Sequence, residues 1–301
     1  LVLRKGTELY FYAAVIVGEL NMRLYDSQGT LHPEEPIQPD FNVGGLPFLA
    51  VTSDLGLEKL RVALGLYAPN GFAASMPDDE ASRYLVTDAI FIASSATGSV
   101  AYEFTPRISL GLSVSLLNTY LNASRVMNPL VLTDPDERFK PVSETESFDY
   151  DLKIDGFGWS WNWAVGVLFR PFDPLRIGAA FTAGAGVSLE GPVTLTAPDG
   201  SVTKSHHSTT MALPFTLRAG FNWEMAPDFE LAADVTYWHY QVMQEQRSTL
   251  TEPLLGIEEF RDPKNFTNGF LWCIGVNYHV TPTLEAMLGW QLDYTPIPTP
   301  T

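Results

Sequence analysis

The sequence contains no run of about 18 consecutive apolar residues, the length that a membrane-spanning helix needs. This lack excludes helical membrane proteins, whereas a β-barrel escapes the test because its strands alternate apolar and polar residues. Charged residues are also scarce, at 18% of the 301 residues, which is low for a soluble surface. The single cysteine, Cys273, excludes a framework of intrachain disulfides.

Basic residues and catalytic motifs are scarce as well. Only 18 basic residues stand against 35 acidic ones, and a net charge of −17 argues against a nucleic-acid partner. His206 and His207 are adjacent on an extended segment, so their side chains point in opposite directions and do not share a metal. Asp149, Asp151 and Asp155 lack a partner histidine or a nucleophile. We therefore predict no catalytic residues, no bound metal and no cofactor.

What the sequence does contain is period-2 alternation. Residues 108–120 read ISLGLSVSLLNTY, with Ile108, Leu110 and Leu112 on one face and small or hydroxylated residues on the other. The segment exceeds the ~5–6 residues of an ordinary strand. It matches the ~9–11 residues that a tilted strand needs to cross a bilayer. This pattern predicts a membrane-spanning β-strand.

Similar segments recur, and the connections between them alternate between short and long. Aromatic residues cluster near the segment ends, as in outer-membrane barrels. The pattern predicts an all-β fold: an antiparallel up-and-down transmembrane β-barrel, represented by about eleven strands of a larger, even-stranded barrel. Two details are specific. The apolar phase changes at Gly156, which predicts a β-bulge, and residues 175–189 form one strand with Val187 and Leu189 facing outward.

The order of these segments resembles the FadL/TodX family of outer-membrane transporters for long-chain fatty acids and aromatic hydrocarbons. The stretches that carry the resemblance are LYAPNGFAASM from Leu66, SVAYEFTPRISLGLSVSLLNTYLNASR from Ser99, DGFGWSWNWAVGVLFRP from Asp155, LRIGAAFTAGAGVSLEGPV from Leu175, ALPFTLRAGFNW from Ala212, LAADVTYWHY from Leu231 and GWQLDYTPIP from Gly289.

The resemblance implies a barrel of ~14 strands in the outer membrane of a Gram-negative cell. It also implies passive uptake of a hydrophobic small molecule, with outer-membrane lipid and lipopolysaccharide as the other partners, by a monomer. The N-terminal hatch of the family and its Asn-Pro-Ala motif are not found before Leu9. We therefore expect residues 1–301 to be a single barrel domain that is truncated at both ends. The alternative is a structural or adhesive barrel, or a general porin, that acts through its long loops.

Two sets of candidate site residues follow. Apolar side chains on the lumen face would bind the solute: Phe91, Leu117, Leu121, Leu168, Trp238, Tyr240 and Met287. For Leu117 and Leu168 simple packing is an equal alternative, and for Trp238 and Tyr240, near a strand end, a place in the aromatic girdle is the favoured one. The family resemblance also implies sideways exit through a kinked strand. The small residues Ser94, Ser95, Ala96, Thr97 and Gly98 interrupt a predicted strand and would form this lateral gate, unless they only make room for a plug.

Overall fold

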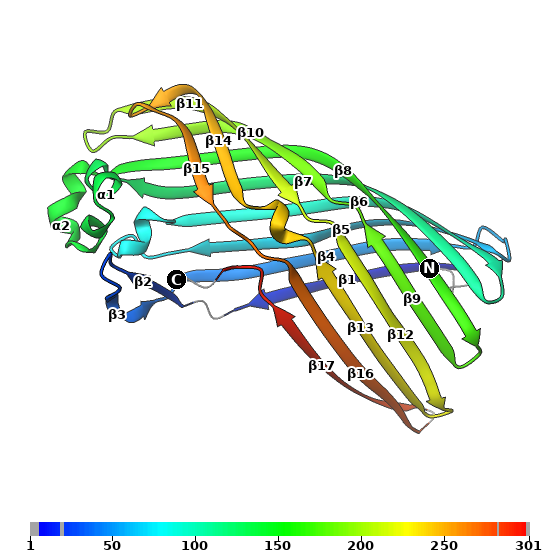
Figure 1. Ribbon diagram of the computed structural model, residues 1–301. Helices are drawn as coiled ribbons and strands as arrows, with labels where there is room; N and C mark the ends of the chain where they lie inside the picture. Colours follow the sequence, from blue (N-terminus) through cyan, green and yellow to red (C-terminus); the bar gives the residue numbers. More distant parts are fainter. Residues whose placement is uncertain (1–5, 19–20, 282, 299–301) are drawn as a thin grey trace.

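The computed structural model describes residues 6–18, 21–281 and 283–298. In these residues, eleven antiparallel strands form a continuous curved sheet in which each strand pairs with the next (Figure 1). This confirms the predicted all-β, up-and-down arrangement. The strands along the sheet are β1 (Thr7–Val17), β4 (Phe41–Ser53), β5 (Leu60–Ser75), β6 (Asp88–Thr105), β7 (Ile108–Met127), β8 (Tyr150–Phe172), β9 (Leu175–Thr182), β12 (Thr216–Ala226), β13 (Phe229–Trp238), β16 (Gly269–Thr281) and β17 (Leu284–Tyr294).

The remaining elements lie at the end of the molecule with the long connections (Figure 1). Four strands branch from β8, and a separate hairpin precedes β4. In the part of the chain that is described, no helix is long and apolar enough to cross a membrane. These elements are β10 (Ala185–Thr196), β11 (Val202–Leu213), β14 (Glu245–Leu254), β15 (Ile257–Pro263), the hairpin β2 (Met22–Tyr25) and β3 (Leu31–Ile37), and the short helices η1 (Ala81–Tyr84), α1 (Pro129–Thr133), η2 (Pro135–Phe139), α2 (Val142–Thr145), η3 (Glu146–Phe148) and η4 (Tyr240–Val242).

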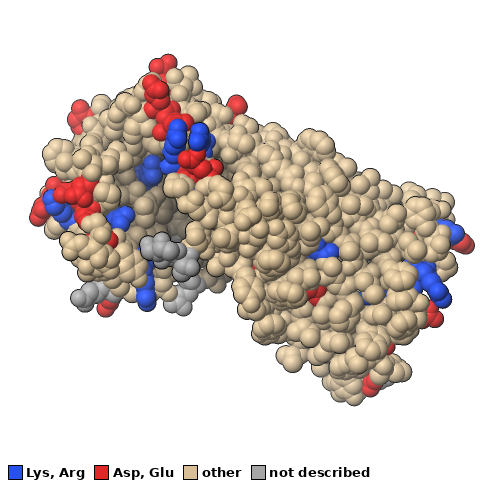
Figure 2. All heavy atoms as spheres, in the orientation of Figure 1, with Lys and Arg blue, Asp and Glu red and all other residues tan. Residues whose placement is uncertain are grey.

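The outer face of the sheet is apolar. Leu116 is 50% exposed and Trp161 64% exposed, although both are large hydrophobic residues. Charged side chains gather mostly at the two ends of the molecule, with a broad uncharged surface between them (Figure 2). An exposed apolar area of this size is unfavourable in water, so we infer that this outer face is in contact with lipid.

The predicted bulge at Gly156 is wrong. The pairs between β7 and β8 continue without a register shift from Tyr150 to Phe169. The apolar phase changes because β8 leaves the membrane at this level. On the loop side of Gly156, Leu152 is 1% exposed and faces an internal core, whereas on the other side Trp159 is 57% exposed on the outer face.

The single strand predicted for residues 175–189 is also wrong. β9 ends at Thr182, and β10 begins at Ala185 and pairs with β8 and β11. Val187 and Leu189 are fully buried rather than outward-facing. β10 passes close to β8, since a Cβ at Gly158 or Gly191 would overlap a backbone carbonyl of the other strand. Glycine at these two positions therefore permits the crossing.

The two ends of the sheet place the chain termini at opposite ends of the barrel wall (Figure 1). Thr7 pairs with Ser53, beside the short β4–β5 connection, while Tyr294 pairs with Phe270 at the end with the long loops.

This topology makes a labelling prediction. In a Cys273→Ser background, Asp199→Cys in the β10–β11 loop should react with a membrane-impermeant maleimide in intact cells. Ala226→Cys, at the short β12–β13 turn, should react only after the outer membrane is permeabilised. Equal reaction of both cysteines in intact cells would contradict the topology.

A candidate solute path through the barrel wall

The wall is irregular at β5. Its pairing with β6 shifts between Tyr67–Ser95 and Asn70–Ala93, so β5 carries one residue more than β6 over this stretch. Pro69 lies in the irregular stretch and has no N–H to donate to a ladder. The result is a β-bulge in β5, which reverses the faces to which its side chains point on either side of it.

The neighbouring ladder between β4 and β5 is open at the same level. Val43 pairs with Ala73 and Phe48 with Tyr67, and no ladder pair joins the residues of β4 and β5 between these two. Pro47 occupies the corresponding stretch of β4 and likewise lacks an N–H. The regular pairing of β4 with β5 is therefore interrupted over several residues, with a proline on each side, although the two backbones remain close: a Cβ at Gly44 would lie 3.0 Å from the Gly71 carbonyl oxygen.

A cavity of about 460 Å³ lies at this seam. Its lining is mainly on the outer face, and it also includes residues whose side chains point to the inner face. Phe48, Tyr67 and Ser95 belong to the inner face. The outer part consists of Phe11, Leu49, Leu66, Ala96, Leu116 and Trp159, and the cavity is also lined by Pro47, Ala68, Ser94 and Asn118.

The predicted gate residues lie beside this seam, but they do not interrupt their own strand. β6 is continuous and pairs with β7 without a shift from Asp88 to Glu103. The irregularity lies in β5 instead, opposite Ser94. Ser94, Ser95 and Ala96 line the cavity, whereas the Thr97 hydroxyl lies 2.8 Å from that of Ser115 and Gly98 lies against Leu64. The role of these five residues stays a prediction.

Three of the predicted apolar residues come together on the inner face. Phe91 is paired with Leu121, and its ring stacks on Phe72 with 5.8 Å between ring centroids. Leu117 lies on the same face of β7, is 7% exposed and pairs with Ser95 of the cavity. Phe72, Phe91, Leu117 and Leu121 thus form an apolar strip that leads to the seam cavity.

The other four predicted residues lie elsewhere. Trp238 and Tyr240 both lie within van der Waals distance of the position that a Cβ at Gly269 would take. Burial and the nearby charge of Asp293 raise the pKa of the Tyr240 hydroxyl, which stays neutral. Leu168 lines a separate hollow of about 590 Å³ nearer the short turns. Met287 is 77% exposed on the edge strand β17.

Sequence reasoning missed Arg125, which continues the apolar strip on β7. It follows Leu121 by four residues and so lies on the same, inner face. Its guanidinium lies 5.6 Å from the ring centroid of Phe260, a cation–π contact. Asp262 is close enough to interact electrostatically with Arg125. Its carboxylate, however, forms an ion pair with Lys264 at 2.5 Å and not with Arg125. Within the described residues, Arg125 therefore has no ion-pair partner. Its inward position could have been predicted from the sequence, because Leu117, Leu121 and Arg125 are all odd-numbered residues of one strand and so share a face.

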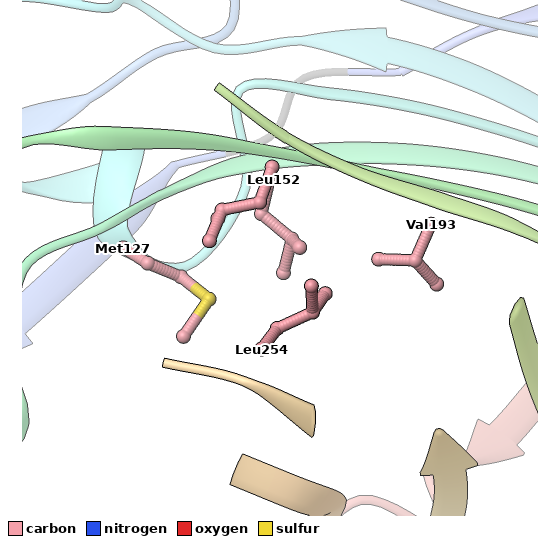
Figure 3. Packing of buried hydrophobic residues seen from close by; sticks show 5 residues of the cluster. Met127, Leu152, Val193 and Leu254 are labelled. Atoms are coloured by element: carbon pink, nitrogen blue, oxygen red, sulfur yellow. The ribbon is translucent and has the colours of Figure 1, made fainter. Parts of the chain in front are cut away.

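An apolar core encloses this end of the path. Met127, Leu152, Val193 and Leu254 point toward one another from β7, β8, β10 and β14 (Figure 3). Phe260 packs against the same cluster while its ring also contacts Arg125. The guanidinium is thus held at the boundary between a dry core and the lumen.

The opposite side of the lumen is charged. Arg176 pairs with Glu224 at 2.6 Å, and the Arg218 Nε donates to the Thr236 hydroxyl at 3.0 Å. Similar contacts join Asn222 to Glu230 and Asn277 to Glu285 on the same inner face. An apolar solute would have to remove water from these groups to lie here, which is unfavourable. The lumen wall therefore carries the apolar strip toward the long-loop end of β5–β7, small and hydroxylated side chains along the rest of these strands, and charged groups on the β9–β17 side.

Comparison with known proteins agrees with this geometry. A family model described as outer membrane protein transport protein (OMPP1/FadL/TodX) matches residues 28–301, so the chain belongs to this family. This membership confirms the resemblance and the outer-membrane location. The protein is an outer-membrane transport protein with a β-barrel fold, consistent with uptake of hydrophobic molecules.

Solved structures are similar to the chain in fold. A Pseudomonas aeruginosa FadL homologue is 16% identical, with a TM-score of 0.77 over 97% of this chain and 72% of that one. The P. putida toluene transporter TodX is 16% identical, with a TM-score of 0.71 over 98% and 77%. A monoaromatic hydrocarbon channel, CymD, is 14% identical, with a TM-score of 0.63 over 98% and 77%. No curated protein matches the chain.

Proposed function

We propose that the protein takes up long-chain fatty acids passively and releases them sideways into the membrane at the β4–β5 seam. The observation that carries this proposal is the open ladder at the seam, with its cavity lined from both faces of the wall. A solute enters from the long-loop end, contacts the strip of Phe72, Phe91, Leu121 and Leu117, and reaches the cavity.

The direction of exit follows from solvation. Moving apolar surface from water into an apolar environment releases roughly 25 cal/mol per Å². The route past Arg176 and Arg218 offers charged groups, whereas the seam opens toward Leu116 and Trp159 on the lipid face. An apolar solute therefore gains most by leaving through the wall.

The two prolines lower the cost of this opening. An unpaired backbone N–H or C=O in hydrocarbon costs several kcal/mol. Pro47 and Pro69 have no N–H. An open seam therefore leaves two fewer backbone donors without a partner than it would with other residues at these positions.

Arg125 favours fatty acids over hydrocarbons as the substrate class. A partly buried cation without an acidic partner is unfavourable unless a ligand supplies the anion. A fatty acid whose carboxylate binds Arg125 can place its alkyl chain along β7 in the direction of Leu117. Leu117 lies eight residues from Arg125, which is about 26 Å along the strand. Aromatic hydrocarbons, named for TodX and CymD, are the second candidate, favoured by the stacked pair of Phe72 and Phe91.

The test compares uptake of labelled oleate and toluene by cells with and without the protein. Oleate uptake should fall when the protein is absent, and toluene uptake should fall less. Loss of toluene uptake alone would select the second candidate. Equal loss of small polar solutes would instead indicate the general porin, and no loss of any solute would leave the structural barrel.

Two further features belong to the same proposal. The barrel acts as a monomer and without catalysis, in line with the transport role of the family. Within the described residues, β1 and β17 each pair on one side only.

A further inference from the structure

A row of polar side chains crosses the outer face of the barrel just beyond the lipid-facing surface. Lys153 of β8 pairs with Thr194 of β10, which pairs with Lys204 of β11. Thr194 lies between Val193 and Leu195, whose side chains point into the core, so the row faces away from the core. Ser124 of β7 pairs with Lys153 and extends the row. The two lysines are two strands apart, about 10 Å.

Both lysines are exposed, and neither has an ion pair or side-chain hydrogen bond among residues 6–18, 21–281 and 283–298. Other lysines at the same end of the molecule are paired. Lys140 contacts Glu137 at 2.7 Å, and Lys264 contacts Asp262 at 2.5 Å. The same outward face also carries the exposed carboxylates Asp151 and Glu190. Neither forms an ion pair with Lys153 or Lys204 among the described residues, so the two ammonium groups are available to an anionic partner.

The level of this row fits the headgroup region of the outer leaflet. The outer face of β7 and β8 ends in the aromatic pair of Tyr120 and Phe157, which are 37% and 48% exposed. Aromatic residues at this position mark the membrane interface. Lys153 lies four residues beyond Phe157, roughly 13 Å along the strand. Asp155, in between, is hydrogen-bonded to Asn122.

We propose that Lys153, Thr194 and Lys204 bind the phosphate groups of lipopolysaccharide in the outer leaflet. The exposed ammonium groups supply the charge, and the hydroxyl of Thr194 between them supplies a neutral donor. The acyl chains of the lipid lie against the apolar column of Phe157, Trp159 and Trp161 on the same face of β8. This site is independent of the solute path and needs only the location in the outer membrane.

The test measures binding of purified protein in detergent to lipopolysaccharide and to the same lipid after phosphatase treatment. A lysine near an anionic lipid surface contributes about fivefold in affinity, so the double variant Lys153→Gln/Lys204→Gln should bind about 30-fold more weakly. Removal of the phosphates should weaken binding of the unaltered protein to a similar extent. The variant Lys153→Arg/Lys204→Arg should retain binding.

The matched control is Lys140→Gln/Lys264→Gln, which removes the same charge from paired lysines and should leave affinity nearly unchanged. Heat-modifiable migration on a gel verifies that each variant is folded. Equal weakening in both double variants would indicate a general charge effect and overturn the proposal. Unchanged binding of the dephosphorylated lipid would do so as well. Oleate uptake by the variant Lys153→Gln/Lys204→Gln, measured in parallel, reports separately on the solute path.

Discussion

Deletion of Pro69 is expected to cause the largest loss of uptake, at least tenfold, while the barrel remains folded. The deletion removes the one extra residue of β5, and the same change restores its register with both β6 and β4. A regular ladder then replaces the interrupted stretch of pairing at the seam. Closing the cavity removes the sideways exit, and the added pairs should preserve or raise stability.

The matched control is Pro69→Ala, which restores the missing N–H but keeps the extra residue. The bulge and its reversed faces persist in this variant and only one additional N–H must be left unpaired when the seam opens, so uptake should fall much less than in the deletion variant. Oleate uptake by cells, together with thermal unfolding of the purified variants, distinguishes the two changes. Normal uptake by the deletion variant, with the barrel intact, would rule out the seam as the exit.

Period-2 alternation was enough to predict the strands of the barrel wall, because a wall between lipid and lumen imposes opposite chemistry on its two faces. The same reasoning failed where the chain leaves the lipid. At Leu152 the apolar side chains face an internal core and the polar ones face water, so a phase change resembles a bulge. Val187 and Leu189 were assigned to the wrong face for the same reason.

The candidate site was predictable in part. Phe91, Leu117 and Leu121 were found because apolar residues on a lumen face break the porin pattern. The bulge itself was assigned to the wrong strand, since small residues at 94–98 are visible in the sequence whereas a register shift at Pro69 depends on two neighbouring strands. Arg125 was missed because its isolation depends on Asp262, 137 positions further along, being paired with Lys264.

Replacement of Arg125 by glutamine is expected to weaken oleate binding about 30-fold, since hydrogen bonds to a charged partner contribute roughly 2 kcal/mol. Binding of methyl oleate, which lacks the negative charge, should be nearly unchanged. The variant should also be as stable as the unaltered protein or more so, because Arg125 has no ion pair to lose among the described residues. Fluorescent fatty-acid displacement and thermal unfolding measure the two effects.

Arg176→Gln provides the contrasting control on the charged side of the lumen. It breaks the 2.6 Å contact with Glu224 and leaves that carboxylate unpaired, so it should lower stability slightly and leave oleate affinity unchanged. A carboxylate site at Arg125 requires this opposite pattern, with affinity lost in one variant and stability in the other. If Arg125→Gln weakens binding of oleate and methyl oleate equally, Arg125 only shapes the path, and the preference for fatty acids over hydrocarbons loses its physical basis.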